Sequence, residues 1–191
     1  MESTVGTSKA FSEESAYFDV IVVGAGLSGI GAGVRLQRDC PDSSFAIIER
    51  REAIGGTWDI FRYPGIRSDS DMHTLGYDFK PWSAEKAIAD GTSIREYVNA
   101  TADEYGVREH IRFQHQLKSA NWHSELGQWV LSVESAGAMV EYRCNVLLMC
   151  AGYYSYVSGY QPEFPGKESF DGTWVHPQFW PQDLDYSNKK V

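Results

Sequence analysis

Three glycines and one acidic residue have the spacing of a dinucleotide-binding site. Gly24, Gly26 and Gly29 form a G-x-G-x-x-G turn, and Glu49 follows twenty residues after the last of them. Such glycines permit a tight turn and let the backbone approach a pyrophosphate at the N-terminus of the next helix. An acid at the later position accepts hydrogen bonds from a ribose 2′-hydroxyl and repels a 2′-phosphate. The pattern therefore predicts a site for FAD or NAD rather than NADP.

The residues around this turn predict the βαβ unit that must position it. Residues 19–23 are a short apolar run rich in β-branched side chains, which is typical of a strand buried on both faces. A helix is expected over residues 27–39, ended near Pro41, and a second buried strand over residues 45–49. The alternative is a βαβ core that binds no phosphate, in which Glu49 merely ends a strand.

The segment that follows favours FAD over NAD. It is an aromatic, glycine-punctuated stretch without a helical period, which suits a surface that covers a flat, partly apolar ring system. The alternative is that its aromatic residues belong to an ordinary core and that its acids form turns or helix caps. The residues to which these alternatives apply are Trp58, Phe61, Tyr63, Asp69 and Asp71.

Composition and charge exclude several classes of partner. The chain has 191 residues with 42% hydrophobic content, enough to bury the core of one domain. Its formal net charge of −9 repels the phosphates of nucleic acids and acidic membrane surfaces. Glycines interrupt the longest weakly polar run, residues 20–34, so no membrane span is expected. The polar, acidic residues 1–16 are expected to be a disordered tail and not a signal peptide.

The cysteines argue for a reducing compartment. Cys40, Cys144 and Cys150 are odd in number and form no C-x-x-C pair, which argues against a disulfide framework or a zinc site. No His, Cys or acidic spacing suggests another metal. We therefore expect a soluble, cytoplasmic protein without a metal.

The middle of the chain predicts a helix followed by a β-meander. The helix is expected to begin at a capping box formed by Ser93 and Glu96. Short alternating segments then predict three strands, with turns at Gly127 and Gly137. The last of these strands is expected to return to the parallel sheet as a buried strand over residues 146–150.

Two further motifs lie downstream of the glycine turn, and their fixed residues are Gly55, Gly56, Thr57, Trp58, Tyr63, Pro64, Gly65 and Asp69, and then Phe170, Gly172, His176, Trp180 and Pro181. Together with the turn and Glu49, they resemble the Baeyer–Villiger monooxygenases of the flavin-containing monooxygenase group. The second motif matches the F-x-G-x-x-x-H-x-x-x-W-P fingerprint of that family at every fixed position. The stretches "FRYPGIRSDSDM" and "HPQFWPQDLDY" look closest to an actinobacterial branch typified by the mycobacterial ethionamide-activating monooxygenase.

The resemblance implies a fold and a division of the chain. The fold is α/β: a Rossmann-like FAD-binding domain of the two-dinucleotide-fold type with a three-stranded β-meander, truncated before the NADPH domain. Residues 1–16 are the expected tail, and residues 17–160 are the first part of the FAD-binding domain. Residues 161–191 are the linker that carries the fingerprint.

The resemblance also assigns roles to residues. Ser28 and Glu49 are expected to hold the pyrophosphate and ribose of FAD, and Asp69 is the expected catalytic residue at the flavin edge. Leu117 takes the position of an adenine contact made through the backbone, and His176 is a linker residue that couples the motions of the cofactor domains. The cofactor-binding residues it implies are Gly24, Gly26, Ser28, Gly29, Glu49, Thr57, Trp58, Asp59, Ile60, Arg67, Ser68, Asp69 and Leu117, of which Arg67, Ser68 and Asp69 also meet the nicotinamide cofactor.

The activity implied by the resemblance is an oxygenation that uses FAD, NADPH and O₂. The expected substrate is a ketone, converted into an ester, or a soft sulfur in a thioether or thioamide. Two alternatives stay open: an N- or S-oxygenating flavin monooxygenase, and a truncated, catalytically inactive FAD-binding half-domain. A fingerprint complete at every fixed position favours the first reading, because the N- or S-oxygenating enzymes normally lack the full pattern.

Overall fold

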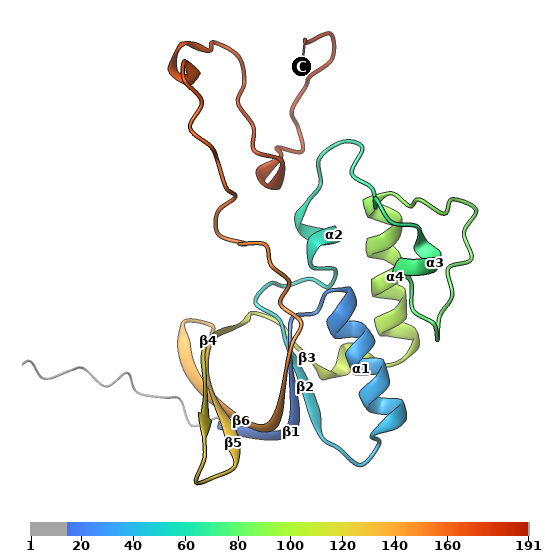
Figure 1. Cartoon of the computed structure of the whole chain (residues 1–191), viewed down its shortest axis with the longest axis vertical. Helices are drawn as coiled ribbons and strands as arrows, with labels where there is room; N and C mark the ends of the chain where they lie inside the picture. The colour runs from blue at the N-terminus through green and yellow to red at the C-terminus, as the bar shows by residue number, and fades with distance from the viewer. Residues whose placement is uncertain (1–14, 191) are drawn as a thin grey trace, which may run out of the picture.

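The chain folds around one six-stranded sheet, with helices on one face of its parallel half and a long linker at one end (Figure 1). The computed structural model describes residues 15–190. The strands lie in the order β3-β2-β1-β6-β5-β4. The elements are β1 (Ala16–Val23), α1 (Leu27–Asp39), β2 (Phe45–Ile48), α2 (Thr57–Ile60), α3 (Met72–Leu75), α4 (Gly91–Glu104), η1 (Val107–His110), β3 (Ile111–Arg112), β4 (His115–His123), β5 (Gln128–Ser135), β6 (Ala138–Met149), η2 (Lys167–Ser169) and η3 (Pro177–Phe179).

The predicted βαβ unit is present. Strands β1 and β2 pair in parallel, and α1 spans the residues predicted for it. Strand β1 begins three residues earlier than predicted, at Ala16, and most of the predicted tail, residues 1–14, lies outside the described residues. The fold class predicted from the sequence is confirmed as a Rossmann-like α/β domain with a β-meander.

Strand β1 is apolar on both faces because each face packs into a separate core. Val20 and Val22 belong to the cluster beneath helices α1 and α4. Ile21 and Val23 point the other way, into the cluster enclosed by the curved meander. The period of two along a strand places alternate side chains in the two cores, which explains the continuous apolar run.

Helix α4 does not begin at the predicted capping box. Its N-cap is Asp90, whose Oδ1 accepts a hydrogen bond of 2.9 Å from the Ser93 amide. Ser93 therefore lies inside the first turn, and its own hydroxyl donates to the other Asp90 oxygen. One face of this helix is buried, and Ile94 and Val98 on it are fully buried. Gly106, in a left-handed conformation at φ 66°, follows its C-cap.

The meander is confirmed, but its last strand differs from the prediction. Strand β6 is one continuous strand that pairs antiparallel with β5 in its first half and parallel with β1 in its second. Its second half is not buried as predicted, since Val146 and Met149 are 48% and 61% exposed. Helix α1 packs mainly on β1 and β2. Val146 lies in register with Val20 on the face that carries α1, whereas Met149 lies in register with Val23 on the opposite face.

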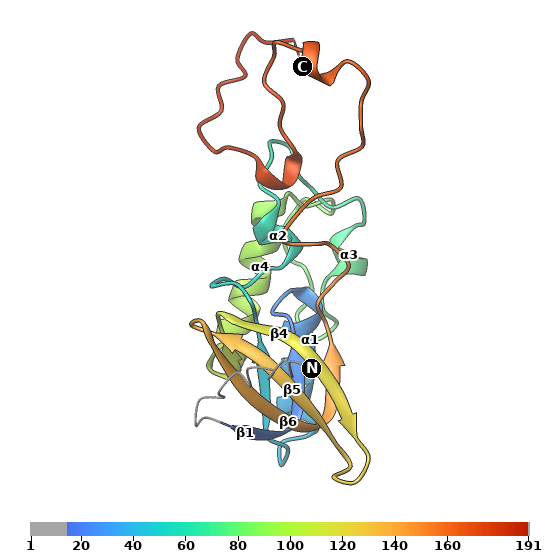
Figure 2. The same cartoon turned by 90° about the vertical axis from the view of Figure 1, so that its left-hand side faces the viewer.

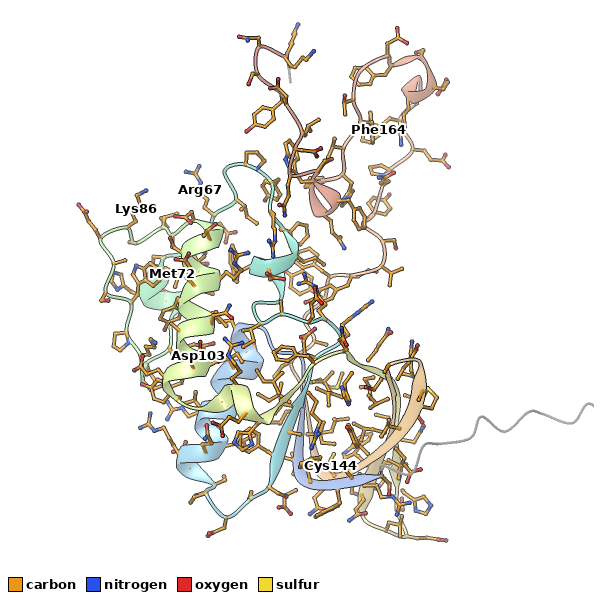
Figure 3. All side chains as sticks on the ribbon, turned by 180° about the vertical axis from the view of Figure 1, so that it is seen from behind. Arg67, Met72, Lys86, Asp103, Cys144 and Phe164 are labelled. Carbon is orange, nitrogen blue, oxygen red and sulfur yellow. The ribbon has the colours of Figure 1, made fainter. Side chains whose placement is uncertain are left out.

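After β6 the chain leaves the sheet as a linker that reaches beyond α2 to one end of the molecule (Figures 1 and 2). The linker of the structure, residues 150–190, includes the predicted linker from residue 161 and also the residues directly after β6; it contains two short 3₁₀ turns, η2 and η3, and no strand. Figure 3 shows the division from behind: Cys144 lies within the sheet, whereas Phe164 lies on the linker. Within the described chain, no helix combines the length and apolar character that crossing a membrane requires.

Candidate functional site

A groove of about 990 Å³ opens where the parallel strands β1, β2 and β6 end. Its floor contains the glycine turn after β1 and the end of β2, and its walls contain residues of α2 and of the linker. In open α/β sheets, ligands bind outside the carboxyl ends of the strands, where neighbouring connections diverge. The groove lies at that position, because β1 is flanked by β2 on one side and by β6 on the other.

Each of the three predicted positions requires glycine for a different structural reason. Gly24 has a φ of 104°, and a Cβ there would lie 2.6 Å from the carbonyl oxygen of Cys150. A Cβ on Gly29 would overlap the carbonyl oxygen of Gly24. Gly26 differs, because the nearest atom to its Cβ would be the Cα of Gly56, at 3.6 Å. The protein itself leaves room at Gly26, so the missing side chain there keeps the groove open for a ligand.

The N-terminus of α1 offers unpaired hydrogen-bond donors to this groove. Gly26 is the N-cap and supplies no side-chain cap, and the first turn contains no acidic residue. Leu27 and Ser28 of this turn line the groove. The first N–H groups of a helix lack partners within it, and the helix dipole adds positive character there. This end of the groove suits a phosphate or pyrophosphate group.

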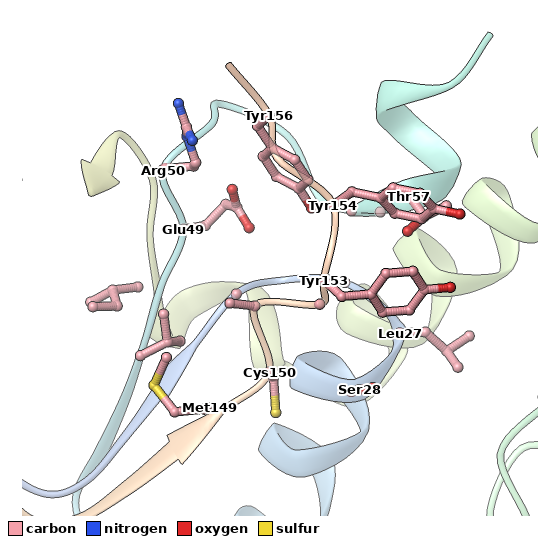
Figure 4. A pocket seen from close by; sticks show the side chains of 18 of the residues that line it. Leu27, Ser28, Glu49, Arg50, Thr57, Met149, Cys150, Tyr153, Tyr154 and Tyr156 are labelled. Carbon is pink, nitrogen blue, oxygen red and sulfur yellow. The ribbon is translucent and has the colours of Figure 1, made fainter. Parts of the chain in front are cut away.

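Glu49 lies at the end of β2, where its carboxylate is buried and faces the groove (Figure 4). Its Oε2 accepts a hydrogen bond of 2.8 Å from the Ala25 amide, and its Oε1 accepts one of 2.9 Å from the Arg51 amide. These bonds fix the carboxylate beside the glycine turn. An ionised carboxylate accepts about four hydrogen bonds, so two positions stay available for the hydroxyls of a ribose.

Three tyrosines of the linker form a wall that the sequence reasoning did not assign. Tyr153, Tyr154 and Tyr156 line the groove; the Tyr156 ring lies beside Glu49, whereas the rings of Tyr153 and Tyr154 extend toward Leu27 and Thr57 (Figure 4). Burial raises the pKa of Tyr156, which keeps its hydroxyl protonated as a donor at neutral pH. Arg50 lies over the Tyr156 ring, 5.5 Å from its centre. Their place directly after a parallel strand was the signal available in the sequence.

Helix α2 places two of its four predicted residues on the groove. Thr57 and Trp58 line it, whereas Asp59 and Ile60 do not. The Asp59 side chain turns away and is buried, with its oxygens 2.6 Å from Arg51 and Arg62 and 3.6 Å from Arg95. Asp59 therefore connects the end of β2 to α2 and α4.

The segment predicted to meet the nicotinamide cofactor lies outside the groove. Arg67 and Asp69 are exposed, and Ser68 is buried with its amide donating to Ala89, 3.0 Å away. The pKa of Tyr154 is raised, mainly by its side-chain hydrogen bond with Tyr153 and also by the negative charge of Asp69. None of Arg67, Ser68 and Asp69 lines the groove.

Asp71 caps a helix, which was one of the two interpretations that the sequence offered for this residue. It is the N-cap of α3, and its Oδ1 accepts a hydrogen bond of 3.0 Å from the Thr74 amide. This hydrogen bond lowers the pKa of Asp71. A structural role accounts for this residue.

Leu117, the residue that the resemblance assigned to an adenine contact, lines the groove. It does so from β4, next to an irregularity in the β4–β5 pairing, while its side chain packs on the core enclosed by the meander. The backbone of Leu117 is thus free to face a ligand. His115, on the same strand, also lines the groove and stacks on Tyr142, with ring centres 5.9 Å apart.

The fingerprint residues of the linker do not gather at the groove. Trp180 lines a second cavity of about 510 Å³, between the linker and residues 58–66. Phe170 packs against Trp174, with ring centres 6.3 Å apart, and Gly172 lies beside the Phe170 ring. Pro181 follows Trp180 as an exposed residue, and His176 is the N-cap of η3. Among residues 15–190, no three His, Cys, Asp or Glu side chains are grouped so as to hold a metal ion.

Two family models match the chain. The NAD(P)-binding Rossmann-like domain matches residues 22–84, and the flavin-binding monooxygenase-like model matches residues 78–191. The second match covers more than half of the chain, and the two together span the groove and the linker.

Individual relatives match over most of this chain and over a minor part of their own length. The chain is 52% identical to the FAD-containing monooxygenase EthA of Mycobacterium tuberculosis, over 92% of this chain and 36% of that protein. It is 47% identical to the probable FAD-binding monooxygenase AlmA of Acinetobacter baylyi, over 92% and 35% respectively. The chain thus spans about a third of the length of these relatives.

Solved structures show the same fold. An oxidized steroid monooxygenase bound to NADP superposes with a TM-score of 0.74 at 30% identity, over 90% of this chain and 33% of that one. A cyclohexanone monooxygenase from Rhodococcus sp. Phi1, bound to NADP⁺, gives 0.74 at 25% identity, over 90% and 32%.

Proposed function

This chain belongs to the flavin-binding monooxygenase-like family, as its motifs suggested, and we propose that it is the FAD-binding part of a flavin-dependent monooxygenase. The partners we propose are NADPH, O₂ and a small organic substrate. The substrate class is a ketone, or a soft sulfur in a thioether or thioamide. No nucleic acid and no metal takes part in this proposal.

One observation carries the proposal. The donors at the N-terminus of α1 and the carboxylate of Glu49 open into the same groove, at the carboxyl ends of neighbouring parallel strands. A dinucleotide needs this pair of features, because its pyrophosphate requires donors and its ribose requires an acceptor. Gly26 supports the fit, since a Cβ there would occupy the groove and make only ordinary contact with the protein, 3.6 Å from the Cα of Gly56.

The residues of this chain would each hold one part of FAD. The turn at Gly26 and Ser28 would bind the pyrophosphate, and Glu49 would bind the adenosine ribose. Thr57 and Trp58 would lie along the flavin, with the tyrosine wall opposite. Bound FAD would supply the oxygen chemistry, after reduction by NADPH, while the protein contributes position, charge and exclusion of water. We propose that Asp69 orients the nicotinamide at the edge of this site.

The cellular setting follows from the same reasoning. We propose a cytoplasmic protein, because its three cysteines are free and the cytosol keeps thiols reduced. Of these, Cys144 is buried in the core, and burial raises the pKa of its thiol, which makes it unreactive.

The proposal is tested by incubating the chain with FAD, removing free flavin and recording the visible spectrum. We expect flavin absorbance to be retained by the chain and lost in Gly26→Val, in which the side chain enters the groove. Ala138→Val, on an exposed residue at the start of β6, is the control and should retain flavin. Equal flavin retention by Gly26→Val and the control would overturn the assignment of this groove.

A further inference from the structure

One residue of the linker is buried although its neighbours are exposed. Among the described residues from 151 to 190, Gln178 alone is buried, with 7% of its surface exposed. A glutamine side chain is costly to bury unless its polar atoms find partners. The partners of Gln178 therefore indicate what this position holds together.

Gln178 joins two stretches of the linker that are distant in sequence. Its side-chain Nε2 donates a hydrogen bond of 2.7 Å to the carbonyl oxygen of Ser155. Its backbone amide donates to His176 Nδ1 at 3.2 Å, which is the cap of η3. The hydrogen bonds of Gln178 thus connect η3, the turn capped by the fingerprint residue His176, to the start of the linker.

The imidazole ring of His176 also packs against the start of the linker. A Cβ on Gly159 would overlap the imidazole ring of His176, so the ring lies directly against the backbone at Gly159. The ring also contacts Phe179, with centres 5.8 Å apart. Together with the Gln178 bond, these contacts fix η3 against residues 155–159.

Ser155 is the link between this contact and the groove. It lies between Tyr154 and Tyr156, and all three residues line the groove. Its hydroxyl accepts a hydrogen bond of 3.3 Å from the Ser158 amide, which closes a local turn. With its carbonyl held by Gln178, the peptide that carries the two tyrosines has a fixed orientation.

We propose that Gln178 is a positioning residue, whose side-chain amide holds the Ser155 carbonyl and thereby sets the tyrosine wall of the groove according to the position of the linker. The residue lies at a position that the fingerprint leaves variable, and it does not line the groove itself. Its effect on a ligand passes through Ser155. The part of this inference that concerns FAD rests on the function proposed above.

The test uses Gln178→Met, which keeps an unbranched side chain of similar length and removes the donor. We expect amide hydrogen exchange of residues 153–158 to rise about fivefold, because the hydrogen bond between the buried Gln178 side chain and the Ser155 carbonyl is lost. The melting temperature should not change, since the contact lies outside both cores. Gln161→Met, at an exposed glutamine of the same linker, is the matched control and should behave as the unchanged chain.

A second variant reaches the same contact by another route. In Gly159→Ala, the methyl group would displace the His176 ring and, with it, the turn that carries Gln178. We expect the same rise in exchange over residues 153–158. Unchanged exchange in both variants would overturn the proposal, and so would an equal rise in Gln161→Met.

The binding measurement separates this proposal from the function on which it rests. We expect the dissociation constant for FAD to rise about fivefold in Gln178→Met, in parallel with exchange. Increased exchange with unchanged FAD affinity would overturn the link between the linker and the groove. If the unchanged chain bound no FAD, the proposed function would fail, whereas the exchange of residues 153–158 would still decide whether Gln178 holds the wall.

Discussion

Removing the carboxylate of Asp59 should destabilise the fold, although the sequence motif places this residue beside the cofactor. The Asp59 side chain is 4% exposed, and Arg51, Arg62 and Arg95 converge on it. In Asp59→Ala, three positive charges lose their shared partner. The loops after β2 and α2 and helix α4 then lose the contact that joins them.

The structure sets the size of the effect. Breaking a fully buried ion pair from one side costs about 3–5 kcal/mol. Here the three arginine side chains are 28%, 42% and 29% exposed, so water can replace part of what the carboxylate provided. We therefore expect a loss of about 2–3 kcal/mol in the free energy of unfolding, below the buried-pair range. For a chain of this length, that corresponds to a fall of roughly 4–12 °C in melting temperature.

Thermal unfolding followed by circular dichroism measures this directly. Asp39→Asn is the matched control, because Asp39 is exposed and lies 3.6 Å from the exposed Arg35. A surface pair of that kind contributes about 0–1 kcal/mol. The reasoning is refuted if Asp59→Ala melts within 1 °C of the control. A normal melting temperature with lost FAD binding would instead place Asp59 on the cofactor, as the motif resemblance suggested.

Three further outcomes are expected. Gly24→Ala should lower the free energy of unfolding by about 2 kcal/mol, from strain at φ 104°, whereas Gly26→Ala should keep its melting temperature and lose FAD affinity. Glu49→Gln should raise the FAD dissociation constant about tenfold, as measured by equilibrium titration. It should also lower the free energy of unfolding by about 1–3 kcal/mol, as measured by melting, because the new amide nitrogen would face a backbone N–H donor. The hydrogen bond from the Ser93 amide lowers the pKa of Asp90, so its contribution to stability is present above about pH 4 and is lost as the pH falls. Asp90→Asn should flatten that part of the curve of melting temperature against pH, and an unchanged slope would contradict the assignment of the cap.

The parts of the fold that the sequence predicted are those that local patterns determine. The apolar run of β1, the helix after it and the glycine turn each follow from neighbouring residues. The start of α4 was wrong because Asp90 and Ser93 are both good cap residues. Long-range backbone bonds decide between them: the Gly91 amide donates to Ile66, and the Ser68 amide donates to Ala89. These bonds hold the chain extended up to Asp90, so the helix begins directly after it.

The same distinction applies to the site. Gly26 and Glu49 were predictable because the motif encodes the turn, the helix start and the end of the second strand within one βαβ unit. The place of the tyrosines directly after β6 was a signal, but the sequence could not show which of their side chains face the groove, because that depends on the path of a linker more than a hundred residues after the glycine turn. The burial of Asp59 depends on arginines from three separate segments, which no local pattern brings together.

The groove therefore combines a floor that belongs to the sheet with two walls held by polar contacts behind them. At the floor, Gly24 contacts Cys150 across the ends of β1 and β6, so a change there disturbs folding and binding together. One wall is α2, held from behind by Asp59, and the other is the tyrosine segment, held from behind by Gln178. Neither holding residue lines the groove, and the two share no partner. Because the tyrosine wall is held by the linker and not by the core, its position can follow the linker while the fold itself stays intact.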